Sequence, residues 1–148
     1  VTLTEVRPDG NELYIQSGWL RFAHRAYSED SALRIYRSFS EQDLLDVPTD
    51  EWVSGMVSIP SFAHPMRAGS KLRVSVTSPG RDHGTWAFEN PVYDATPTFS
   101  LGYGDGVASS ILLSTLTDIE IPAEYPPCPS LRGQPCREYV ETPNRSAN

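Results

Sequence analysis

The residues best suited to acid–base chemistry or metal binding in this sequence are its three histidines, His24, His64 and His83. His64 is the most suggestive, because it stands between an alanine and a proline in FAHPMRAG, with an arginine three residues on. Imidazole serves as a general base, a proton carrier or a metal ligand near neutral pH. The three histidines are not spaced like a metal site on one helix or strand. No metal ligand and no cofactor are therefore predicted.

Hydrolytic chemistry also needs a nucleophile that a histidine can activate. The α/β-hydrolases expose a serine on a strained strand-to-helix elbow with the spelling GxSxG, and no window of this sequence matches it. The serines near glycines, in VTSPG and AGSKL, fall at the ends of predicted strands. Asp82 and His83 could act as an acid–base pair, but no nucleophile is assigned to them. The sequence predicts no catalytic residue.

Three other patterns could bind ligands. LGYGDG, residues 101–106, is glycine-rich but lacks the lysine and the strand–helix context of a phosphate loop. Asp9 and Asn11 carry oxygen atoms that suit calcium, although a turn explains PDGN fully. The tryptophans could form a stacking platform for sugars or fill the core and its rim, and the second interpretation is favoured; they are Trp19, Trp52 and Trp86.

The charge balance argues against nucleic acid as a partner. The chain has 148 residues, 12 basic against 19 acidic side chains and a net charge of -7. Binding by counterion release needs clustered lysine and arginine, whereas the cations here are few and scattered. No apolar run approaches the ~18 residues of a membrane helix, and no signal-peptide pattern opens the chain. The chain begins with Val1 instead of methionine, which suggests a processed or excised piece.

The two cysteines, Cys128 and Cys136, lie at the ends of a proline-rich loop in EYPPCPSLRGQPCREY. Their spacing is too wide for a CxxC redox or zinc pair. We expect a small disulfide ring, which would place the protein outside the reducing cytosol. Two free thiols in a cytosolic tail are the alternative.

Strand-like alternation begins at the first residue. VTLTEV and ELYIQ, residues 1–6 and 12–16, flank the turn RPDG. Pro8 presets φ at the first central position of that turn, and Gly10 can take a positive φ. These segments predict a hairpin.

Further strands are predicted at residues 18–27, 51–59, 71–76, 85–94 and 108–116. In the third of these, Leu72, Val74 and Val76 are expected to face the core, and the last is apolar enough to be buried on both faces. Residues 28–50 are polar and irregular, with at most one short helical turn in SEQDLLDV. Together these segments predict an all-β antiparallel jelly-roll sandwich.

The amino-acid composition changes from Ile121 onward, where prolines recur. These prolines are expected to exclude any regular secondary structure. We therefore predict a β-sandwich domain over residues 1–120 and a proline-rich tail over residues 121–148.

The stretches RPDGNELYIQSGWLRFAHR, IPSFAHPMRAGSKLRVSV and TWAFENP occur in this order. Together they resemble the C-terminal β domain of the X-Pro dipeptidyl-peptidase and cocaine-esterase-like serine hydrolases, over roughly residues 1–118. Met66 and Lys71 depart from the family pattern, which often has an aromatic or aliphatic residue and an arginine there. The residues that carry the resemblance are Gly18, Leu20, Arg21, Phe62, His64, Arg67, Gly69, Leu72, Arg73 and Trp86.

The resemblance implies a galactose-binding-domain-like fold and a partner. In that family the Ser-Asp-His triad belongs to an α/β-hydrolase domain of the same protein, so no catalytic residue carries over onto this sequence. Family members usually open the β domain with further strands, and their absence here would leave a sheet edge without a neighbour. Homo-oligomerisation is left open.

The resemblance also bears on His64, which it places in the crossover before residues 71–76. A neutral imidazole at a strand end can bond a backbone carbonyl, and Pro65 holds the turn. Arg67 and Arg73 could anchor loop carbonyls or pair with acidic neighbours. We therefore predict a structural role for His64.

The function predicted is a non-catalytic accessory domain of a secreted bacterial serine hydrolase, of the X-Pro dipeptidyl-peptidase or acyl-esterase type. A free-standing carbohydrate- or ligand-binding β-sandwich module is the alternative.

Overall fold

The computed structural model describes residues 1–31, 34–78, 92, 94–104, 106–128 and 135–141. These residues form strands, extended loops and short 3-10 helices. Their strands pair antiparallel throughout, which confirms the predicted all-β antiparallel fold class. An apolar helix of membrane-spanning length is absent from these residues.

The predicted N-terminal hairpin is confirmed. β1 (Thr2–Val6) and β2 (Asn11–Ser17) pair antiparallel on either side of the turn. Gly10 has a φ of 84° and donates its N–H to the Arg7 carbonyl over 3.1 Å. The Asn11 N–H donates to Asp9 Oδ1 over 2.9 Å. Glycine takes such a φ without the steric cost of a side chain, so the sequence DG fixes this turn locally.

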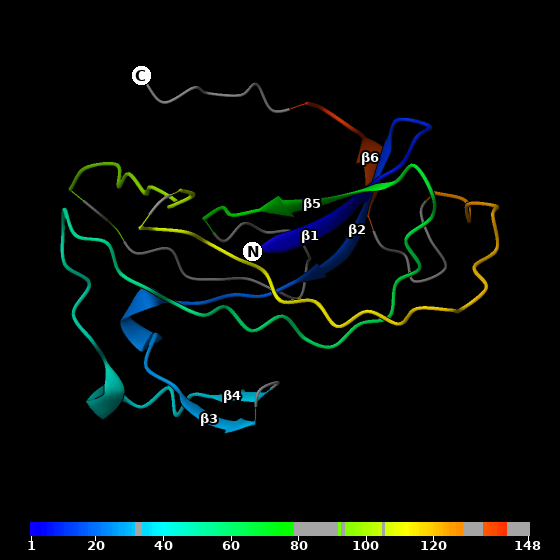
Figure 1. Ribbon diagram of the computed structural model, residues 1–148. Helices are drawn as coiled ribbons and strands as arrows, with labels where there is room; N and C mark the ends of the chain where they lie inside the picture. The colour runs from blue at the N-terminus through cyan, green and yellow to red at the C-terminus, as the bar shows by residue number, and fades with distance from the viewer. Residues whose placement is uncertain (32–33, 79–91, 93, 105, 129–134, 142–148) are drawn as a thin grey trace.

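The hairpin is the centre of a four-stranded sheet with the order β5-β1-β2-β6 (Figure 1). β5 (Lys71–Ser75) pairs with β1 as a predicted strand, and β6 (Cys136–Glu138) pairs with β2. The expectation that prolines exclude any regular element after residue 121 is wrong. Pro135 precedes β6 instead of interrupting it, and its carbonyl accepts the Tyr14 N–H over 3.0 Å. The boundary between residues 120 and 121 stays a prediction.

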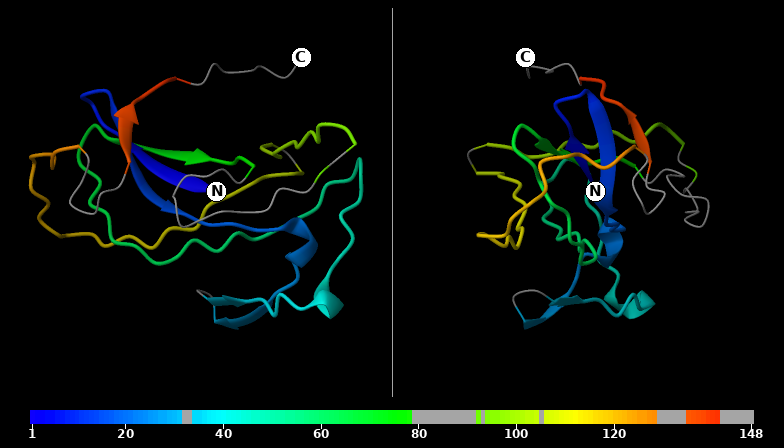
Figure 2. Two further views of the ribbon diagram at one scale, coloured as in Figure 1. Left: turned by 180° about the vertical axis from the view of Figure 1, so that it is seen from behind. Right: turned by 90° about the vertical axis from the view of Figure 1, so that its right-hand side faces the viewer.

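A small lobe lies at the end of the molecule away from β6 (Figures 1 and 2). We call residues 22–31 and 34–46 the small lobe. It contains two antiparallel strands and two 3-10 helices: η1 (Phe22–His24), β3 (Ser28–Ser31), β4 (Arg34–Tyr36) and η2 (Glu41–Asp43).

The small lobe corrects two sequence-based expectations. Residues 18–27 are predicted as a strand but turn through η1, and residues 28–50 are predicted as irregular but contain the β3–β4 hairpin. The Arg25 guanidinium donates to the Phe22 carbonyl over 3.0 Å and to the Asp46 carbonyl over 2.7 Å. These contacts fold the chain back on itself, which side-chain alternation cannot reveal. The expectation of at most one short helical turn in SEQDLLDV agrees with η2.

Two further strand predictions are wrong. Residues 51–59 and 108–116 contain no strand. Alternation indicates which side chains share a face, whereas a strand also needs a neighbouring backbone for its hydrogen bonds. The second segment is not buried on both faces as predicted, since Leu112 is 81% exposed. The strand predicted at 85–94 lies largely outside the described residues.

The core is small and is centred on the hairpin. Its buried apolar side chains come from β1 and β2: they are Leu3, Val6, Leu13 and Ile15. The pairing register sets Val74 opposite Leu3, so β5 presents its apolar side chains on the same face. Their predicted burial is nevertheless wrong in this chain, because Leu72, Val74 and Val76 are 37%, 44% and 54% exposed. β5 is an edge strand of the sheet that the described residues form, where fewer neighbours cover each side chain.

Candidate functional site

A fully buried carboxylate, Glu5, lies at the centre of the first polar cluster. It projects from β1, and its side chain has no solvent exposure. Ser70 donates its hydroxyl to Glu5 Oε1 over 2.6 Å, and His64 Nε2 lies 2.8 Å from Oε2. Both partners come from the loop that precedes β5. Gly69 has a φ of 85° in that loop, a conformation that favours glycine and that turns the chain before Ser70.

The same cluster reaches the proline-rich tail through Tyr125. The Tyr125 hydroxyl lies 2.8 Å from Ser70 Oγ. The guanidinium groups of Arg7 and Arg67 lie 5.1 and 5.2 Å from the centre of the Tyr125 ring, within cation–π range. Arg7 donates to the Pro126 carbonyl and Arg67 to the Pro122 carbonyl, each over 2.8 Å. The cluster therefore ties β1, the loop before β5 and the tail together.

The Glu5 cluster contains serine, histidine and a carboxylate, but not in a catalytic order. In a hydrolytic triad the histidine lies between the serine and the acid, so that it can take the serine proton. Here Glu5 lies between Ser70 and His64, and the Ser70 proton points to the carboxylate. His64 Nε2 bonds Glu5, whereas the sequence suggested a backbone carbonyl as one partner that the imidazole can bond. Its structural role stays a prediction.

A second buried carboxylate, Glu12, holds the sheet at the β6 side. Glu12 accepts the Thr4 hydroxyl over 2.7 Å. Arg73 Nη1 lies 3.2 Å and Arg137 Nε 3.1 Å from Glu12 Oε2. Arg73 also lies over the Tyr139 ring at 5.4 Å. Arg73 thus pairs with an acidic neighbour, as the sequence suggests, and the cluster links β1, β2, β5 and β6.

Burial by itself would raise the pKa of Glu12, but the bonds from Arg137 and Thr4 and the charges of Arg137 and Arg73 lower the pKa below 4.5. A carboxyl whose pKa is lower in the folded protein stabilises it above the unfolded pKa. That stabilisation is lost as the pH falls through the folded pKa.

We expect Glu12→Gln to destabilise the chain by about 1–3 kcal/mol at pH 7, because the arginines lose a buried charged acceptor. The difference from the wild type should shrink as the pH falls below about 4.5. Chemical denaturation at several pH values measures both effects. Glu138→Gln changes an exposed glutamate on β6 and should stay near the wild type. A constant difference from pH 7 down to pH 3 would contradict this account.

Gly18 and Leu20 pack against the segment that contains Gly55 and Ser58. A Cβ on Gly18 would clash with the Ser58 carbonyl oxygen, so the position needs a glycine for close backbone approach. The Leu20 side chain lies 3.1 Å from the position that a Cβ on Gly55 would take. These contacts give a packing role to Gly18 and Leu20, two of the residues that carry the family resemblance.

The remaining motif residues do not join either cluster through a described contact. Arg21 is exposed, Phe62 is 39% exposed, and Trp86 lies outside the described residues, as do Asp82 and His83. Cys128 and Cys136 form the predicted disulfide, with their Cα atoms 5.6 Å apart. Because Cys136 begins β6, the bridge fastens the tail to the edge of the sheet.

Sequence reasoning missed the two carboxylates at the cluster centres. Glu5 and Glu12 occur in short strands that also carry the core leucines, and an acidic residue inside such a strand is a usable signal. The burial of such an acidic residue can be predicted only when the distant cations and hydrogen-bond donors that contact it are known. In the described part of the chain, no group of three histidine, cysteine or acidic side chains could hold a metal ion.

The family comparison gives a match over residues 1–103, to the X-Pro dipeptidyl-peptidase C-terminal non-catalytic domain. No curated protein and no solved structure matches the chain. The matched residues include β1, β2, β5 and the loop that carries His64, Arg67 and Gly69. The antiparallel all-β fold and the non-catalytic order of the Glu5 cluster agree with that match. The chain therefore belongs to the family of X-Pro dipeptidyl-peptidase C-terminal non-catalytic domains.

Proposed function

We propose that this chain is the accessory domain of a secreted serine hydrolase, of the X-Pro dipeptidyl-peptidase or acyl-esterase type, and that it packs on the α/β-hydrolase domain. A non-catalytic domain of a peptidase needs a catalytic partner that supplies the nucleophile. In this proposal the two buried polar clusters stabilise the accessory domain, and its exposed apolar side chains contact the partner.

The observation that carries the proposal is the exposure of large aliphatic side chains between residues 111 and 121. Leu112 and Leu116 are 81% and 84% exposed. The others are 37% to 57% exposed: Ile111, Leu113, Ile119 and Ile121. Single exposed leucines are ordinary on protein surfaces, whereas several along one segment are typical of an interaction site. We call residues 111–121 the aliphatic segment.

Export is supported by the disulfide between Cys128 and Cys136. Structural disulfides persist mainly in oxidising compartments, and they are rare in the cytosol of mesophiles. The galactose-binding-domain-like topology and self-association both remain part of the proposal.

A test of the docking surface is the double variant Leu112→Asp/Leu116→Asp, assayed for co-purification with the separately expressed catalytic domain. We expect binding at least about tenfold weaker, because charges replace apolar side chains at the contact. Melting of the accessory chain should change little, since both leucines are already exposed in it.

The matched control is Val47→Asp/Val140→Asp, which likewise places aspartate at two exposed aliphatic positions, outside the aliphatic segment. It should bind like the wild type. Equal binding of all three proteins would reject the aliphatic segment as the docking surface. Loss of self-association in the leucine variant, without any effect on the catalytic domain, would assign the segment to a homo-oligomer instead.

The carbohydrate-binding alternative has one observation in its favour, the 61% exposure of Trp52. Of the other two tryptophans, Trp19 is half-buried and Trp86 lies outside the described residues. A single exposed indole can stack on a sugar ring. Titration with simple sugars, monitored by tryptophan fluorescence, tests this alternative directly.

A further inference from the structure

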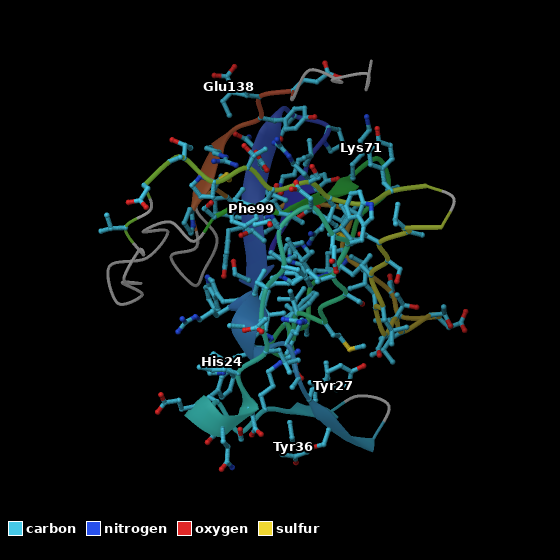
Figure 3. All side chains as sticks on the ribbon, turned by 90° about the vertical axis from the view of Figure 1, so that its left-hand side faces the viewer. His24, Tyr27, Tyr36, Lys71, Phe99 and Glu138 are labelled. Atoms are coloured by element: carbon cyan, nitrogen blue, oxygen red, sulfur yellow. A yellow bond between two sulfur atoms is a disulfide. The ribbon has the colours of Figure 1, made fainter. Side chains whose placement is uncertain are left out.

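Apolar burial contributes little to the pairing of β6 with the sheet. This strand is three residues long, and in the sheet that the described residues form it pairs with β2 alone. No side chain from residue 135 to residue 140 is buried, and Val140 is 72% exposed. Figure 3 shows Glu138 of β6 at the outer edge of the molecule, with its side chain pointing away from the sheet. Since apolar burial is the dominant stabilising term in folding, other contacts must hold β6 in place.

The contacts between β6 and the hairpin are polar. The Pro135 carbonyl accepts the Tyr14 N–H over 3.0 Å, and the Tyr139 N–H donates to a carbonyl of the hairpin turn over 2.9 Å. Arg137 Nε lies 3.1 Å from Glu12 Oε2, but the Arg137 side chain is 69% exposed. An ion pair with one partner so exposed contributes little to stability. A strand held in this way can open locally while the rest of the sheet stays folded.

The disulfide joins β6 to a part of the tail that is anchored separately. Cys136 begins β6, whereas Cys128 lies two residues after Pro126. The Pro126 carbonyl accepts from the buried Arg7 over 2.8 Å, and the Arg7 guanidinium lies 5.1 Å from the centre of the Tyr125 ring. These contacts do not involve β6. The cleavage of the bridge would therefore leave the Cys128 side of the tail on the sheet and remove a covalent restraint from β6.

The position of the bridge suits reversible reduction. Both cysteine residues keep part of their surface exposed, and thiol–disulfide exchange needs a thiolate to reach one of the two sulfur atoms. The two cysteines are separated by eight positions in the sequence, so their thiols stay close to each other after reduction. The bridge can then form again when an oxidant is present.

We propose that the disulfide between Cys128 and Cys136 is a redox switch that controls the pairing of β6 with β2. The reductant is a dithiol: one thiolate attacks a bridge sulfur, the S–S bond breaks and a mixed disulfide forms. The second thiol of the reductant resolves the mixed disulfide and closes the reductant's own disulfide. Two electrons and two protons thereby pass to the bridge, and both cysteines become thiols.

In the reduced state β6 leaves the edge of β2, and Arg137 moves away from Glu12. Backbone groups of β2 that pair with β6 in the oxidised chain are then open to solvent or to another strand. The surface that this edge presents therefore depends on the redox state. The switch does not depend on docking to a catalytic domain.

The test is amide hydrogen exchange of the full 148-residue chain, observed by NMR in the presence and absence of dithiothreitol. We expect the Tyr14 and Tyr139 amides to exchange at least about tenfold faster after reduction, because their partners lie across the β2–β6 boundary. The amides that pair β1 with β5 should change by less than about twofold. The double variant Cys128→Ser/Cys136→Ser should behave like the reduced chain without any reductant.

Arg137→Gln provides a second variant, which weakens the pairing of β6 without touching the bridge. Because β6 pairing and the disulfide stabilise each other, this variant should be half reduced at a dithiothreitol concentration about two- to fivefold lower than the wild type. Glu138→Gln changes the next residue of β6, which is exposed, and should need the same concentration as the wild type.

Three results would overturn the proposal. The first is a bridge that persists in excess dithiothreitol, and the second is unchanged exchange at Tyr14 and Tyr139 in the reduced chain and in the serine variant. The third is equal acceleration of all amides of the sheet, which would make the disulfide a restraint on the whole fold. None of these results bears on co-purification with the catalytic domain, so the two proposals fail separately.

Discussion

Glu5→Ala is expected to destabilise the chain by about 3–5 kcal/mol, the largest effect of any single substitution considered. The carboxylate is fully buried and lies within hydrogen-bond distance of Ser70 and His64. Its removal also takes the ion-pair partner, 3.9 Å away, from the buried Arg7 guanidinium. For a domain of this size the melting temperature should fall by roughly 6–20 °C.

Thermal unfolding followed by circular dichroism measures this effect. Glu41→Ala is the matched control, because it removes an exposed glutamate from η2 and should change the free energy of unfolding by less than about 0.5 kcal/mol. Glu5→Gln keeps an acceptor for the Ser70 hydroxyl, so its melting temperature should lie between those of Glu5→Ala and Glu41→Ala. A melting temperature of Glu5→Ala within about 2 °C of the wild type would show that the cluster does not hold the tail.

The isolated chain is expected to hydrolyse neither acyl esters nor X-Pro amides. Serine hydrolases accelerate acyl transfer by about a million-fold or more. They do so with a nucleophile, a base and oxyanion donors that are held in a fixed geometry. Ser70 donates to Glu5 and not to His64, so the described residues do not place an imidazole to take its proton for attack on a substrate. Rates with a chromogenic ester and an X-Pro amide should equal those of buffer.

His64→Gln in the full-length parent gives the complementary control. The melting temperature should fall, because the contact between His64 and Glu5 is lost. Turnover should stay within about threefold of the wild type, because His64 takes no part in the chemistry. Loss of turnover by several orders of magnitude, with unchanged melting, would make His64 a catalytic residue.

The hairpin and β5 are predictable from sequence because their signals are local. The DG turn sets a positive φ at Gly10, and the alternation on either side sets the faces. The β3–β4 hairpin escapes prediction, since residues 28–36 lack alternation and the lobe is closed by Arg25 contacts some 20 residues away in sequence. Residues 108–116 fail for a different reason: their apolar composition predicts a buried strand, but no described strand pairs with them.

The polar clusters are harder to predict than the strands. A glutamate in an alternating strand would ordinarily indicate the solvent face. Glu5 and Glu12 are buried only because His64, Ser70, Arg73 and Arg137 reach them from distant parts of the chain. The family resemblance singled out three of the residues around them, His64, Arg67 and Arg73, without indicating which acid each would meet.

A serine-directed phosphonate probe with intact-mass detection tests whether this chain is a non-catalytic domain. We expect no adduct on the 148-residue chain, and one adduct on the proposed serine hydrolase, at a serine of its catalytic domain. Stoichiometric labelling of Ser70, or of any other serine in the isolated chain, would overturn the non-catalytic assignment.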